Sequence, residues 1–277
     1  MLLCIKVLVV IMFLIMAKAI RSKKGDGFTV KVNGKIKKFS VQELPKDFVE
    51  WNLGQRIANL QKMRAKLEGK DHSAIIGGGF GSHLPVYITH NEAKGAFFPV
   101  NAAVKGTGFV AKDEYLDYYI KKFRAVYEAT EIKDEATQKA ITRSVVTRVE
   151  TIMEFYEATD KIDLRCMTGL EIWPGRTTKN FYADPRVSIH YLGLSLPKRP
   201  ERYGQWQVNC IWEKLERKDK RFEFGDALRA LTLGSVGRSF VPGHVPTAHT
   251  PTKGQYPFGW ALWVIETLDK GIDNPRD

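Results

Sequence analysis

The side chains best suited to metal chemistry in this 277-residue sequence are its histidines, because four of the six lie in two loop-like regions. These four are His83, His90, His244 and His249. Imidazole nitrogens are common zinc ligands, and a carboxylate such as Glu92 or Asp226 can complete the set. The pattern predicts a zinc site and, with it, a metal-dependent hydrolase. The competing interpretation is isolated loop histidines, since no pair has the helical i, i+4 spacing.

Residues 235–257 form the second of these regions and contain four prolines and three glycines. Proline fixes φ and lowers the entropy cost of holding a loop in place. A simple connector does not need so long a segment, so we expect an ordered loop that lines a pocket, with His244 and His249 near its mouth. If the pocket takes an anion, His249 and Lys253 are expected to donate to it, more strongly as the pH falls through about 6.5.

A third stretch suggests a phosphate-bearing cofactor. Residues 180–189 read Asn-Phe-Tyr-Ala-Asp-Pro-Arg-Val-Ser-Ile. This stretch is similar to the N-L-x-x-D-P-R-V segment of the flavin-binding split-barrel oxidases. In that family a basic residue three positions before the asparagine reaches the FMN phosphate. Here that position is Thr177, with Arg176 and Lys179 as its basic neighbours. The resemblance implies FMN as a cofactor, an oxidoreductase as a second alternative function, and Arg176 and Lys179 as ligand-binding residues.

Other common catalytic motifs are missing from the sequence. The glycine-rich run 77–81 is not a dinucleotide fingerprint, because Ser82 stands where the third glycine would be needed. No H-E-x-x-H, G-x-S-x-G, P-loop or C-x-x-C pattern occurs. The sequence therefore does not decide whether the protein is an enzyme.

The N-terminal residues 1–19 indicate export. Their uninterrupted apolar run, residues 7–17, is 11 residues long, whereas a membrane-spanning helix needs about 20. The run ends in Ala17-Lys18-Ala19, which has the small-residue pattern of a signal-peptide cleavage site. We expect a secreted or periplasmic protein whose mature chain starts at Ile20 and has no stable transmembrane span. A retained membrane anchor is the alternative.

Cleavage would leave two cysteines, Cys166 and Cys210, which we expect on the apolar face of adjacent strands. In an exported chain such a pair favours a disulfide. The alternative is two buried free thiols that pack as small apolar residues.

The charge balance favours anionic partners. The formal net charge is +12, and 44% apolar with 27% charged residues excludes a disordered chain. With no clear catalytic motif, the leading hypothesis is an exported basic binding or assembly protein of the cell envelope or extracellular space. Its expected partner is an anionic envelope surface or a protein, with nucleic acid less favoured. Solubility alone is the competing explanation of the charge.

The elements that must position these residues indicate an α+β fold. Residues 28–41 are typical of a lysine-rich hairpin turning at Asn33-Gly34. Residues 44–67 are typical of an amphipathic helix, with Arg56 on its polar, solvent-facing side. Residues 70–112 are expected to be rich in loops, and residues 112–160 to hold two antiparallel helices, the second capped by Asp134. The later sequence alternates polar and apolar residues, which predicts an antiparallel meander. It also predicts a short helix at 224–233 and leaves 260–268 open between helix and strand. Regions 20–160 and 161–277 are expected to form one compact domain.

Overall fold

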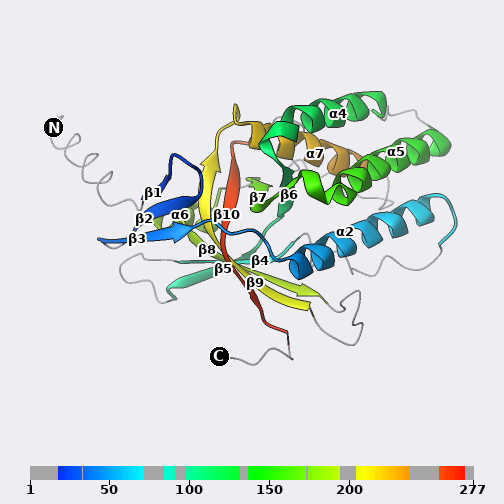
Figure 1. Ribbon diagram of the computed structural model, residues 1–277. Coiled ribbons are helices and arrows are strands. Elements are labelled where there is room, and N and C mark those ends of the chain that lie inside the picture. Colours follow the sequence, from blue (N-terminus) through cyan, green and yellow to red (C-terminus); the bar gives the residue numbers. More distant parts are fainter. Residues whose placement is uncertain are drawn as a thin grey trace.

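The large sheet contains seven antiparallel strands and provides the frame of the molecule (Figure 1). The computed structural model describes residues 18–32, 34–71, 84–90, 98–131, 137–172, 174–193, 204–236 and 256–271. In sheet order the strands are β5 (Val100–Val104), β4 (Val86–His90), β8 (Arg186–Gly193), β9 (Gly204–Leu215), β10 (Gly259–Asp269), β7 (Ile162–Leu170) and β6 (Gly108–Ala111).

Strand β10 settles the choice that the sequence left open, because residues 260–268 lie in a strand. It pairs with β9 on one side and β7 on the other. Its first six residues, Gly259 to Val264, are all buried, so both faces of the sheet are covered here. A strand buried on both faces is apolar throughout rather than alternating, which is why its period could not be read from the sequence.

Four helices cover this frame: α2 (Lys46–Leu67), α4 (Leu116–Ala129), α5 (Gln138–Glu157) and α7 (Lys220–Val236). Figure 1 shows them grouped on one side of the sheet. The contact among α4, α5 and α7 is aromatic, since Tyr119, Phe123, Phe155 and Phe224 lie with ring centroids 4.9–6.4 Å apart. Such edge-to-face and tilted ring pairs stabilise a core beyond the apolar area they bury.

A smaller sheet packs against β10 at Trp263. It contains β1 (Lys18–Arg21), β2 (Gly27–Val32) and β3 (Lys35–Ser40), in the order β1-β2-β3. Phe28 and Val30 are buried, and the Phe28 ring lies 6.2 Å from that of Trp263 on β10. The Arg21 guanidinium lies over the same indole, 3.6 Å from the ring centroid. The small sheet is therefore fastened to the large one by its inner face.

The α+β class predicted from the sequence is confirmed, and so are several of its elements. Val32 pairs with Lys35 in the hairpin, and Gly34 has φ of +74°, as a two-residue turn requires. The helix predicted at 44–67 is α2, and the one at 224–233 lies within α7.

Four details of the prediction are wrong, although β8, β9 and β10 do form an antiparallel meander. The segment 70–112, expected to be rich in loops, supplies strands β4, β5 and β6, and β7 pairs with β10 and β6 rather than with β8. Arg56, expected on the solvent side of α2, is buried and donates to Asn52 and to the Thr107 carbonyl. The α5 N-cap is Thr137, whose hydroxyl accepts from the Ala140 N–H; Asp134 lies outside the described residues.

Two findings bear on the N-terminal prediction. Within the described part of the chain, no helix combines the length and the apolar character needed to cross a membrane. The predicted cleavage point after Ala19 falls inside β1, where Ala19 pairs with Val30. Cleavage there would leave only Ile20 and Arg21 of that strand.

Candidate functional site

Most of the predicted metal and anion ligands lie outside the described residues. These are His83, Glu92, His244, His249 and Lys253. His90 is described and ends β4, where it pairs with Val100. Among the described residues there is no group of three or more histidine, cysteine, aspartate or glutamate side chains able to hold a metal. The zinc site and the hydrolase stay predictions from the sequence.

The predicted disulfide is wrong, because Cys166 and Cys210 are both free and buried. Cys166 pairs with Trp263 on one side of β10, and Cys210 pairs with Val264 on the other side. Paired residues share a face and successive residues alternate, so the two thiols lie on opposite faces of the sheet. Two strand spacings also separate them by about 9.5 Å, beyond the reach of a disulfide.

Thiol labelling tests this correction. Burial raises the pKa of Cys166 to about 12 and the pKa of Cys210 well above its usual range. At pH 8 the reactive thiolate is then scarce, so we expect neither cysteine to react with iodoacetamide in the native protein. In denaturant without reductant both should be alkylated. If Cys166 and Cys210 both stayed unlabelled under those conditions, the correction would be overturned and the predicted disulfide supported.

The flavin-like pattern, residues 180–189, begins in the second half of helix α6 (Arg176–Ala183), passes through the turn at residues 184–185 and ends in β8. The helix starts after Gly175, which offers no side chain to cap it. The first N–H groups of a helix have no partner within the helix, and the helix dipole makes that end favourable for anions. Arg176 and Lys179 are exposed beside it. The N-terminus of α6 therefore combines backbone donors with two cationic side chains.

A ring of buried polar contacts fastens α6 to strands β4 and β5. The Asn101 amide donates to the Thr177 hydroxyl over 3.1 Å, and the Asn180 amide donates to the Thr89 hydroxyl over 3.0 Å. The Thr89 hydroxyl in turn donates to the Asn101 carbonyl over 3.4 Å. Because every link joins the helix to the sheet or one strand to the next, the first turn of α6 is held in one position.

The remaining residues of the pattern have packing roles. Phe181 stacks on Trp212, with ring centroids 5.1 Å apart and planes 13° apart. Asp184 is fully buried and accepts from the backbone N–H and the guanidinium of Arg186. Arg176 and Lys179, the two basic residues that the resemblance points to, are both exposed, and Tyr182 of the same stretch is 36% exposed.

A second polar cluster lies beside the first turn of α6. Both carboxylate oxygens of Glu171 lie 3.1 Å from the Lys105 amine, and the Thr178 hydroxyl donates to one of them over 2.5 Å. The Glu171 side chain is 1% exposed and that of Lys105 is 16% exposed. The Lys105 amine also lies 5.0 Å from the centroid of the Trp260 ring. The cluster ties α6 to β7 and to the segment after β5.

Sequence reasoning missed Lys105, Glu171 and Thr178. Glu171 follows a strand of the predicted antiparallel meander, and such a sheet commonly has one face in water. A glutamate on a solvent-facing side needs no buried partner, so the sequence gives no signal of the ion pair. Since the sheet is buried on both faces here, only the three-dimensional pairing reveals a buried carboxylate with its lysine.

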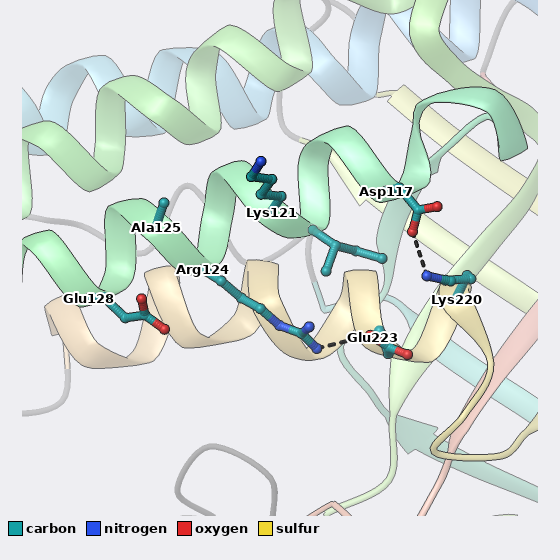
Figure 2. Close-up of a pocket in the computed structure, with 8 residues that line it drawn as sticks. Asp117, Lys121, Arg124, Ala125, Glu128, Lys220 and Glu223 are labelled. Carbon is teal, nitrogen blue, oxygen red and sulfur yellow. Dashed lines mark hydrogen bonds and ion pairs between the residues drawn. The ribbon is translucent and has the colours of Figure 1, made fainter.

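A groove of about 460 Å³ lies elsewhere, between α4 and α7 (Figure 2). Two ion pairs cross it: Arg124 with Glu223 at 3.1 Å and Lys220 with Asp117 at 2.5 Å. Figure 2 shows the paired side chains pointing at each other rather than into open space. None of the predicted ligands that the structure describes lines the groove. Its ion pairs are accounted for by the packing of two helices.

Comparison with known proteins adds little. No protein-family profile matches the chain, and no curated protein matches it. Among solved structures, the chain is similar to an FMN-binding protein from Syntrophomonas wolfei subsp. wolfei. The two share 9% sequence identity at a TM-score of 0.34, over 82% of this chain and 95% of that chain. A likeness this weak carries no argument about the fold or the ligand of this chain.

Proposed function

We propose that the first turn of α6 binds the phosphate of FMN and that the protein is a flavin-binding protein of the split-barrel kind. The observation that carries the proposal is the uncapped, rigidly held N-terminus of α6 with Arg176 beside it. Helix N-termini bind phosphate through backbone N–H groups and the dipole. The residues that resemble the flavin-binding family, 180–189, start on this helix and continue through the turn into β8.

The donors present suit a phosphate group. The Thr177 hydroxyl accepts from Asn101, so its own proton remains available to an anion. Thr177 stands where the family has a basic residue, and the positive charge comes instead from Arg176, one position earlier. A planar guanidinium can give two parallel hydrogen bonds to a phosphate.

Each part of the chain then has a defined task. Arg176, Thr177 and the α6 backbone bind the phosphate, Lys179 adds charge one turn later, and the Asn180–Thr89 contact keeps the helix in place. FMN supplies electron-transfer chemistry when bound. The exported binding protein and the zinc hydrolase stay predictions from the sequence.

Titration with FMN tests the proposal. We expect saturable quenching of flavin fluorescence when the purified full chain is added, with inorganic phosphate competing at high concentration. Raising the salt concentration should weaken binding, because Arg176 and Lys179 are exposed and their charges are screened. Unchanged fluorescence up to millimolar protein would overturn the proposed function.

A further inference from the structure

The outer face of the small sheet combines cations with exposed isoleucines. Residues that pair across strands share a face. Ile20, Thr29 and Lys38 form one cross-strand row, and Lys31 and Ile36 form the next. The two isoleucines are 57% and 68% exposed, and both lysines are exposed. Each row therefore presents one cation and one large apolar side chain to the surroundings.

This face is distinct from the side that packs on the core. Phe28 and Val30 alternate with Thr29 and Lys31 along β2, and they are buried against the large sheet. The apolar residues needed to hold the small sheet are thus already in place. Ile20 and Ile36 add nothing to that packing. Exposed large apolar side chains in a small sheet favour aggregation, so their presence here points to a binding role.

The charge around the face has one sign. Residues 18–42 contain eight basic residues and one acidic residue, Asp26. The Asp26 carboxylate accepts a hydrogen bond from the Ser22 hydroxyl at 2.5 Å, and this bond lowers its pKa. Lys23, Lys24 and Lys37 are exposed nearby. An anionic surface would therefore be attracted across the whole small sheet.

From this arrangement we propose that the outer face of β1–β3 docks on an anionic lipid bilayer. Lysines meet the acidic headgroups, and the isoleucines between them enter the headgroup–acyl boundary. Nucleic acid fits less well, because single strands are held by aromatic stacking and this face offers aliphatic side chains instead. In the sequence, the apolar run 7–17 directly precedes β1.

Vesicle binding by the full chain tests the proposal. The probes are neutral phosphatidylcholine vesicles and mixed phosphatidylcholine–phosphatidylglycerol vesicles, with a double-stranded DNA fragment as a third probe. We expect preferential binding to the anionic vesicles, decreasing as salt rises. Because both vesicle types offer the same hydrocarbon to residues 1–17, the difference between them isolates the headgroup contribution.

Two double variants locate the contact. Lys31→Gln with Lys38→Gln should weaken binding to anionic vesicles about 25-fold, or roughly fivefold for each lysine. Ile20→Ser with Ile36→Ser should cost a similar factor, because about half of each side chain is available for insertion. The control, Lys139→Gln with Lys218→Gln, makes the same charge change on exposed residues elsewhere.

The outcomes divide cleanly. Loss in both double variants with normal melting temperatures supports the bilayer contact. Equal binding to neutral and anionic vesicles overturns it, as does a loss no larger than that of the control. A third outcome is binding to DNA that the isoleucine changes do not weaken, together with equal binding to both vesicle types. This result would identify nucleic acid, rather than a bilayer, as the partner. None of these results depends on FMN binding at α6.

Discussion

The Arg176→Glu variant should bind FMN about 30- to 100-fold more weakly than the parent chain. The change removes a charge-assisted contact of about 1.5–3 kcal/mol and places a carboxylate beside the phosphate. Arg176 is exposed at the start of α6, so the fold does not depend on it. Fluorescence titration measures the change, and an unaltered melting temperature shows that the helix is intact.

Two matched changes make this result specific. Lys179→Glu, one turn further from the helix N-terminus, should weaken FMN binding less, because the effect of the dipole and of the first N–H groups fades within a turn. Lys139→Glu alters the same charge at the start of α5 and should leave binding unchanged. If all three variants lost FMN affinity equally, the effect of Arg176→Glu would come from the net charge of the protein and not from a contact at α6.

The Glu171→Ala variant should lower the free energy of unfolding by about 2–3 kcal/mol. Removing one partner of a buried ion pair leaves the other charge without compensation and costs about 3–5 kcal/mol. We expect less here, because the Lys105 side chain keeps 16% of its surface exposed and can turn toward water. The variant also leaves the Thr178 hydroxyl without its acceptor. Urea unfolding measures the loss.

A double variant separates the lost charge pair from the lost packing. Glu171→Ala combined with Lys105→Met removes the uncompensated cation and should recover about 1 kcal/mol of stability relative to Glu171→Ala alone. Asp117→Ala breaks the ion pair between Asp117 and Lys220, whose side chains are 78% and 56% exposed, respectively. Because this pair is exposed, the change should leave stability unchanged. If Glu171→Ala were as harmless as Asp117→Ala, the buried pair would have no structural role.

The elements that sequence reasoning found are those whose signals are local. The β2–β3 hairpin turns where the sequence predicts, because the +74° φ of Gly34 suits glycine. The stripe on α2 and the alternation in β7 likewise depend on neighbours within one segment. The class α+β follows from these elements without knowledge of how the strands pair.

The parts that failed depend on partners distant in the chain. Cys166 and Cys210 looked like neighbours because their strands were expected to lie close together, but β10 is inserted between those strands. Arg56 looked like a surface residue, yet its guanidinium meets the Thr107 carbonyl 51 positions later. Lys105 and Glu171 are 66 residues apart and only the sheet brings them together. At α6, Arg176 and Lys179 are predicted as ligand-binding residues through a resemblance rather than through their chemistry.

The comparison of FMN with riboflavin tests the central claim most directly. The two ligands share the isoalloxazine ring and differ by the phosphate that Arg176, Thr177 and the α6 N-terminus are proposed to hold. The account predicts that the full chain binds FMN at least tenfold more tightly than riboflavin, and that Arg176→Glu removes most of this difference. Equal affinity for the two flavins, or no binding of either, would contradict it.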